Sequence, residues 1–453
     1  MADRQHMRLR RTIRITKNVL IFFLGICSLS LQRANAGQFG FSVGYQGEYT
    51  NNVQLTPTNP EEDWINTLFA GLMFTENSAD LAANIQAQIS YLNYSRGIYE
   101  DEIRSDLNAA AIWSIVPKRF LWNFADYLSQ YPLSSISAPT PNNLETVNAF
   151  TTGPDLIVSI DPVNALVLGL RVGNTWLKEG NTDQNLFGTV LRWRHSIDPI
   201  SQFSINLLDT KNFYTEDLPV IPNYLLNYLR EDLFVRYSRT LLWSNFVVDA
   251  GRTRILPEGD VEGVDKPIVR LILTRRASSE STLGLSYRSE VMDLGTALLT
   301  NVADPSLPQT ITSPPGTSIT ALATGDIFFI RAGDAFYSFS GKRIGIQTSV
   351  FLREYDYRFL HTEDRTESGV YLKLSNILSP TLTANLYGEA LRTEYQSITL
   401  LTRNINYGLT VTYRISPGLG MDMAISHNGR NSSDPLNSYE ATIASVRVTY
   451  GTK

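Results

Sequence analysis

The chain of 453 residues is poor in the side chains that most often carry catalysis and metal binding. It has one cysteine, Cys27, and four histidines, none of which stands in an HExxH motif or another metal-ligand spacing. Glycine-rich phosphate loops and calcium-loop signatures are missing as well. The sequence therefore predicts no metal and no cofactor.

Two histidines nevertheless have neighbours from which a hydrolytic site could be built. His427 stands between Ser426 and Asn428, and His361 precedes Glu363 and Asp364. Barrel phospholipases and proteases activate a serine or a water molecule with a histidine and a carboxylate or amide. A strand end and a solvated loop explain the two positions without catalysis, and the sequence favours a protein that is not an enzyme.

Long apolar runs are scarce too, and the main one lies near the N-terminus. Six basic residues at 4–17 precede an apolar run at 19–31, and Ala34-Asn35-Ala36 offers small residues for cleavage. These features predict a secretory signal peptide over residues 1–36, which would remove Cys27 and leave a mature chain of residues 37–453. A membrane anchor is the alternative, but a run of about 13 residues is shorter than the roughly 20 that a spanning helix needs.

Positive charge is scarce in the remainder. Residues 1–36 hold seven of the 39 basic residues and one of the 44 acidic residues, so the mature chain keeps 32 and 43, a net charge of −11. A nucleic-acid partner would need a basic stripe, which the sequence lacks. No later segment approaches the roughly 18 consecutive apolar residues of a transmembrane helix. If the mature protein crosses a membrane, it must cross it with strands.

The mature chain contains many segments in which apolar and polar residues strictly alternate. Between residues 402 and 415, one parity carries Ile405, Tyr407, Leu409, Val411, Tyr413 and Ile415, and the other carries Asn404, Asn406, Gly408, Thr410, Thr412 and Arg414. Successive side chains of a strand point to opposite faces, so such a segment has one apolar and one polar face. Soluble sheets bury their apolar faces against one another, whereas a transmembrane barrel turns them outward to lipid.

The connections between these segments alternate in length, which predicts a topology. Short turns are expected near residues 76–80, 117–119, 161–162, 198–199, 240–242, 277–280, 340–342, 379–380 and 416–417, and longer polar connections at 51–63, 130–153, 215–229, 255–265, 293–326 and 429–439. Outer-membrane barrels have short periplasmic turns and long external loops. We therefore expect an all-β protein: a transmembrane, antiparallel, up-and-down β-barrel of about 18–20 strands with both termini in the periplasm.

The polar parity carries charge that would face the lumen of such a barrel. The candidate lumen-lining residues are Arg192, Arg194, Arg236, Arg270, Arg343, Arg414 and Arg447, with Glu389 and Asp422 among the few acids expected there. One interpretation is a charged ladder that braces the wall of a wide barrel. The other is a wall rich in arginine that favours anionic solutes.

The longest insertion, residues 295–325, contains no charge except Asp304. It would be either an ordinary external loop or a segment folded into the pore as a constriction or lid, since connections of this length are often functional. Its lack of charge favours contact with a barrel wall.

The start of the mature chain resembles a known family. The sequence FSVGYQGEYTNNVQLTP at residues 41–57, with Tyr49-Thr50-Asn51-Asn52-Val53 at the end of the first strand, is similar to the first hairpin of β-barrel porins found with exopolysaccharide and PEP-CTERM/exosortase systems. The resemblance implies an outer-membrane channel of a Gram-negative bacterium that is tied to polysaccharide secretion. Polysaccharide and periplasmic export components would then be its partners, beside membrane lipid, and no catalytic residues come with the family.

The sequence thus favours a passive outer-membrane channel for export of an extracellular polysaccharide. The alternatives are a general or anion-preferring diffusion porin, a barrel that displays its loops as an adhesin or scaffold, and a soluble secreted β-propeller. A propeller would repeat a shared motif about every 40 to 50 residues, whereas the hairpins of this chain share only parity and turn chemistry.

Overall fold

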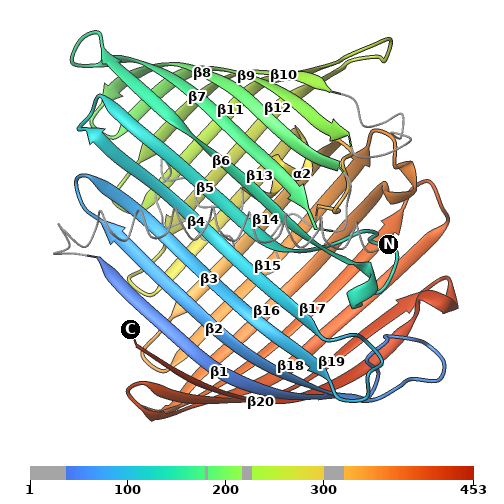
Figure 1. Cartoon of the computed structure of the whole chain (residues 1–453). Coiled ribbons are helices and arrows are strands. Elements are labelled where there is room, and N and C mark those ends of the chain that lie inside the picture. The colour runs from blue at the N-terminus through green and yellow to red at the C-terminus, as the bar shows by residue number, and fades with distance from the viewer. Residues whose placement is uncertain (1–36, 179–181, 217–226, 300–320, 453) are drawn as a thin grey trace.

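A computed structural model of the chain describes residues 37–178, 182–216, 227–299 and 321–452, which form one closed barrel of 20 antiparallel strands (Figure 1). Each strand pairs with its neighbours in chain order, and β1 pairs with β20 to close the ring. The predicted fold class is confirmed, with the strand number at the upper end of the expected range. The predicted signal peptide, residues 1–36, lies outside the described residues.

The strands are 12 to 17 residues long. Their bounds are β1 Gln38–Thr50, β2 Asp63–Asn77, β3 Leu81–Tyr94, β4 Glu102–Val116, β5 Phe120–Pro132, β6 Leu144–Ser159, β7 Asn164–Leu177, β8 Thr182–Asp198, β9 Ser201–Glu216, β10 Tyr228–Thr240, β11 Ser244–Pro257, β12 Val264–Arg276, β13 Ser281–Met292, β14 Phe328–Ser340, β15 Ile344–Tyr357, β16 Arg365–Ser379, β17 Leu382–Tyr395, β18 Leu400–Ser416, β19 Leu419–Ser432 and β20 Tyr439–Thr452.

All nine predicted short turns lie between consecutive strands at one end of the barrel, which we call the turn end. Four of them contain a register shift just before a proline, at Pro117, Pro199, Pro380 and Pro417. Proline has no N–H to donate to the ladder, so a bulge ends the regular pairing there. The proline turns therefore help to set where these hairpins reverse.

The opposite end, the loop end, carries the longer connections. The predicted loop at residues 130–153 was too long, because β6 already begins at Leu144, and the connections at 95–101, 178–181, 358–364 and 396–399 were missed. The described helices are short and lie in these connections: η1 Pro141–Asn143, α2 Leu294–Leu299, η2 His361–Glu363 and η3 Pro435–Asn437. None of the helices in the described ranges has the length and apolar character needed to cross a membrane.

The alternation in sequence becomes two faces of the sheet. Ile405, Leu409 and Tyr413 of β18 are exposed on the outer face, as are large apolar residues of nearly every other strand. The register places Asn406 and Thr410 on the inner face. Inner and outer faces can be told apart because α2 packs on the inner face of β5–β7.

The short motif behind the family resemblance closes the seam between the first and last strands. The buried Asn52 side chain donates to the carbonyls of Thr56 and Glu440 at 2.8 and 3.0 Å, and Asn51 Oδ1 accepts from Thr442 N at 2.7 Å. Val53 packs against Leu92 and Tyr94. These contacts give the motif a structural role, because they tie the first loop to β20 and to β3.

Candidate channel lumen

The inner wall on β10–β13 carries a connected network of arginines and carboxylates. On β10 and β11, Arg236 Nε and Nη2 donate to the two carboxylate oxygens of Asp249 at 2.7 and 2.9 Å. Arg270 of β12 bridges Asp249, at 3.1 Å, to Glu290 of β13, and Arg288 Nε lies 3.1 Å from the other Glu290 oxygen. Asp249 and Glu290 are at most 1% exposed, so the arginines cover them and present the guanidinium groups to the lumen.

Similar pairs lie on β10 itself and on β14–β16. Arg230 Nε lies 2.9 Å from Asp232 on β10, Arg353 of β15 lies 3.3 Å from Asp334 of β14, and Arg365 Nε donates to Glu367 on β16 at 2.7 Å. A buried carboxylate needs such a partner, because removing a charge from water costs several kcal/mol when it stays unpaired. We call this surface the ladder wall; it comprises Arg230, Asp232, Arg236, Asp249, Arg270, Arg288, Glu290, Asp334, Arg353, Arg365 and Glu367 on β10–β16.

The structure brings only some of the sequence-predicted lumen residues together. Arg236 and Arg270 meet at Asp249 in the ladder wall. The others are spread over the barrel. Arg192 of β8 donates to Asn206 at 2.6 Å, and Arg194 is two residues further on the same face. Arg447 of β20 lies over the Phe69 ring at 4.0 Å, and Asp422 of β19 accepts from Thr412 at 2.6 Å. Glu389 lies on the inner face of β17, and Arg414 is exposed near the turn end of β18.

Two expectations about this face were wrong. Arg343 lies in the turn between β14 and β15 rather than in a strand, because β15 begins at Ile344. Inner-face acids are also not few: Asp249, Glu290 and Asp334 all accompany arginines. The alternation in sequence could have placed these acids on the inner face, since Asp249 alternates with apolar outer residues such as Val248. The alternation cannot predict which arginine each acid contacts.

The β5–β6 connection, residues 133–143, crosses the lumen near the loop end, and we call it the first crossing segment. Its Ser134 and Ser135 hydroxyls donate to Glu363, at 2.6 and 2.5 Å, in the β15–β16 connection. Arg430 of β19 donates to the Ile136 carbonyl at 2.9 Å, and Tyr395 of β17 donates to Ser135 at 3.1 Å. The β15–β16 connection lies half a turn of the barrel away from β5 and β6, and β17 and β19 lie somewhat nearer, so the segment reaches from one wall to strands across the barrel.

The long insertion between β13 and β14 also enters the barrel at both of its described ends. We call residues 293–299 and 321–327 the second crossing segment; residues 300–320 lie outside the described residues. Its helix α2 packs against β5, β6 and β7, and Gly295 approaches β7 so closely that a Cβ would stand 2.3 Å from the Thr175 hydroxyl. Ala323 N donates to the Pro132 carbonyl at 2.8 Å, which ties the second crossing segment to the end of β5, where the first crossing segment begins.

A hydrophobic cluster forms inside the barrel where these segments meet, and we call it the central cluster. Its buried members are Val147, Ala149, Leu177, Met292, Leu294, Ala297, Leu298, Ala321, Leu322, Ala323, Phe328, Ile330, Ala332, Tyr355 and Tyr357. Side chains from β6 and β7 thus meet side chains from β14 and β15 through α2 and residues 321–323. The described part of the insertion therefore narrows the lumen near the loop end.

Two aspartates at the borders of the insertion hold it in place. Asp293 accepts from Tyr228 Oη at 2.6 Å and from Thr296 N at 2.7 Å. Asp326 accepts from the amides of Phe359 and Leu360, both at 2.9 Å. Burial raises the pKa of the Asp326 carboxyl, and the backbone hydrogen bonds oppose that shift only in part.

The candidate metal and hydrolytic residues are used in other ways. Asp356, His361 and Asp364 lie near one another, but Asp364 already accepts from Tyr357 N at 2.6 Å and lies 3.0 Å from His361 Nδ1. The register places Ser426 and His427 on opposite faces of β19. His427 lies beside Tyr407 on the outer face, too far round the strand to activate the Ser426 hydroxyl.

No family model matches the chain, and no curated protein matches it. Among solved structures, the siderophore receptor PirA from Pseudomonas aeruginosa is 10% identical, covers 93% of this chain and 81% of its own, and gives a TM-score of 0.43. The outer membrane protein OpdK from Pseudomonas aeruginosa is 8% identical over 92% of this chain and 99% of its own, with a TM-score of 0.38. A BenF-like porin from Pseudomonas fluorescens Pf-5 is also 8% identical, over 92% and 98%, with a TM-score of 0.38. These identities and TM-scores assign no function to this chain.

Proposed function

We propose that this protein is a passive channel of a Gram-negative outer membrane through which small hydrophilic solutes diffuse. The observation that carries the proposal is the contrast between the two faces of one closed barrel. Large apolar side chains are exposed on the outer face, whereas the inner face carries paired charges, amides and hydroxyls. Such a barrel satisfies its backbone groups in lipid and leaves a polar interior for water. The turn end would face the periplasm.

Membrane residence can be tested by comparing adjacent residues on the two faces of β18. Leu409 is exposed on the outer face, and Thr410 lies on the inner face. Leu409→Arg should hinder assembly, since a charge near the bilayer midplane costs about 2–4 kcal/mol, whereas Thr410→Arg should be tolerated. Heat-modifiable gel migration of the membrane fraction measures folding. Equal effects of the two variants would contradict the proposed register in lipid.

Conduction is tested with purified protein in planar bilayers. The two crossing segments should restrict the pore, so replacing residues 295–325 by a short Gly-Ser linker should raise single-channel conductance. Heat-modifiable migration must show that the deleted variant still folds. A folded, inserted protein that passes no ions would overturn the channel function, and unchanged conductance after the deletion would show that the insertion does not limit flow.

Export of a polysaccharide remains a prediction from the sequence resemblance. The central cluster and both crossing segments would have to move aside for a polymer, so the geometry favours small solutes. Swelling of proteoliposomes in isosmotic sugar and dextran series separates the two: entry of small sugars alone supports diffusion, and entry of dextran supports export. An adhesin or scaffold barrel would give neither.

A further inference from the structure

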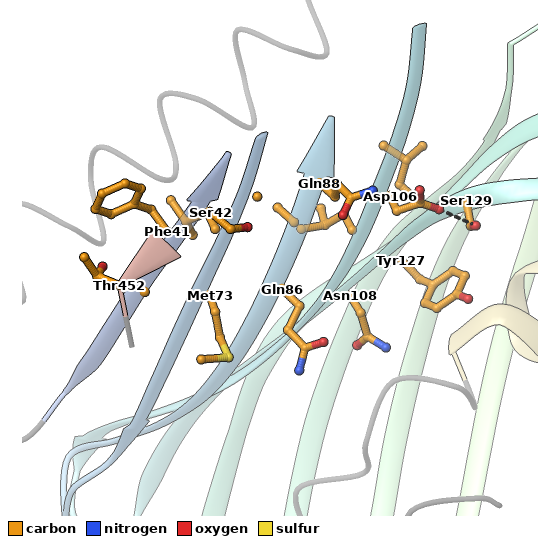
Figure 2. A pocket seen from close by; sticks show the side chains of 16 residues that line it. Phe41, Ser42, Met73, Gln86, Gln88, Asp106, Asn108, Tyr127, Ser129 and Thr452 are labelled. Atoms are coloured by element: carbon orange, nitrogen blue, oxygen red, sulfur yellow. Dashed lines mark hydrogen bonds between the residues drawn. The ribbon is translucent and has the colours of Figure 1, made fainter. Parts of the chain in front are cut away.

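The inner wall opposite the ladder contains a cavity of about 580 Å³ across β1–β5 (Figure 2). Two adjacent cross-strand rows form it. One row consists of Ser42, Gly71, Gln88, Asp106 and Ser129, and the other of Gly40, Met73, Gln86, Asn108 and Tyr127. Gly40 and Gly71 contribute no side chain to these rows, and the side chains of Met73 and Ser42 lie close beside them. The volume falls within the roughly 300–1,000 Å³ typical of small-molecule sites.

Amides and hydroxyls that both donate and accept hydrogen bonds line the cavity, and Asp106 is the one charged side chain among its lining residues. Gln86 and Asn108 lie side by side on β3 and β4 and project to the same side (Figure 2). Among the described residues neither amide has a hydrogen-bond partner, so both are free to engage a solute. An amide offers two donors and an acceptor, which matches the hydroxyl groups of a polyol.

One carboxylate and one aromatic ring complete the set. Asp106 accepts from the Ser129 hydroxyl at 2.7 Å through one oxygen, and a carboxylate keeps further acceptor sites for neighbouring hydroxyls of a ligand. Tyr127 projects from β5 next to Asn108 and also packs against the central cluster. Its ring offers an apolar face, suited to the C–H face of a sugar ring, with a hydroxyl at the edge.

We propose that this cavity is a binding subsite for a neutral polyhydroxylated solute of the size of a mono- or disaccharide. The proposal rests on the channel function, because the solute would bind in the lumen on its way past the crossing segments. An anion is disfavoured since Asp106 is the one carboxylate on the cavity wall and no arginine or lysine joins it there. A largely apolar ligand is disfavoured because the amides would be left without partners.

The test uses maltose as the probe and the open channel as the reporter. A sugar bound in the lumen obstructs ion flow, so maltose should lower single-channel conductance with a measurable half-blocking concentration. The double variant Gln86→Ala/Asn108→Ala should raise that concentration at least about five-fold, the loss expected from one neutral hydrogen bond of about 1 kcal/mol. The control is Asn406→Ala, an inner-face amide on β18 far from the cavity, which should leave it unchanged. Gluconate and choline should block more weakly than maltose.

Equal half-blocking concentrations in wild type and the double variant would overturn the subsite, as would stronger block by gluconate or choline. If the protein passes no ions, the channel function fails, but the subsite can still be judged by calorimetric titration of maltose into the folded protein in detergent. Binding that the double variant loses and Asn406→Ala keeps then supports the subsite. Absence of binding, or equal affinity in all three proteins, overturns it.

Discussion

The wall formed by β1–β5 and the ladder wall on β10–β16 face one lumen with different chemistry. Around the cavity, Gln86 and Asn108 keep their amides exposed to the lumen. In the ladder wall, Asp249 and Glu290 are buried and depend on Arg236, Arg270 and Arg288. The comparison teaches that polar residues on the same barrel face can either remain available to a solute or be committed to holding the wall.

This difference favours the bracing interpretation for two of the predicted arginines. Arg236 and Arg270 each contact a carboxylate, so most of their positive charge is compensated within the wall. Arg192 and Arg194 lie on the inner face of β8, and Arg192 donates to Asn206.

The largest effect is expected when a ladder carboxylate loses its main partner. Arg270→Leu leaves Asp249 and Glu290 buried with fewer cations, and we expect the free energy of unfolding to fall by about 3 kcal/mol. The matched change on the opposite wall, Gln86→Leu, should alter it by less than about 0.5 kcal/mol, since that amide has no partner to lose. Urea titration of the folded barrel in lipid measures both. Equal losses would remove the distinction between the walls.

A smaller effect is expected at the bridge that joins the two halves of the barrel. Glu363 is buried and accepts hydrogen bonds from Ser134 and Ser135 of the first crossing segment. Glu363→Ala should loosen that segment by about 2 kcal/mol, the value of charge-assisted hydrogen bonds, and increase conductance fluctuations. Glu394→Ala, at an exposed ion pair, is the control. The bridge would be contradicted if the variant showed unchanged conductance fluctuations and residues 133–143 were cleaved by a protease no faster than in the wild type.

Ion selectivity should change only modestly. Replacing Arg192, Arg194 and Arg236 together by Gln removes positive charge from the inner face, so the reversal potential in a salt gradient should shift toward cations. Replacing Gln86 and Asn108 by Ala should leave it unchanged. If the triple variant keeps the wild-type reversal potential, these arginines serve only to hold the wall.

The smallest effect concerns the pH dependence of the Asp326 anchor. Burial raises the pKa of this carboxyl above 3.8 in the folded protein, so the folded state binds its proton more tightly than the unfolded state. The contribution of Asp326 to stability therefore falls as pH rises from about 4 through the raised pKa, and changes little above it. Asp326→Asn should remove this decrease in stability with rising pH, because the amide does not titrate. Urea titrations at several pH values measure it, and a steeper slope in the variant would contradict the sign.

Sequence alone determined the barrel and the direction of its strands. Alternation with a period of two is a local property, as the exposed Ile405 and Leu409 show, and proline turns such as Pro380 end pairing wherever they occur. The nine short turns could be located for that reason. Loop bounds were less certain, because β6 continues through polar residues that look like a loop in sequence.

Only the tertiary structure decided what the lumen contains. Ser134 and Glu363 are 229 residues apart, and their contact depends on closure of the ring that brings β6 opposite β16. The pairing of Arg270 with both Asp249 and Glu290 depends in the same way on strand register, which parity leaves open. The cavity at Gln86 and Asn108 depends on the register as well, because pairing of β1–β5 brings its lining residues into adjacent rows. A period of two assigns each side chain to a face, whereas the side chains that meet on that face are set by the stagger of 20 strands.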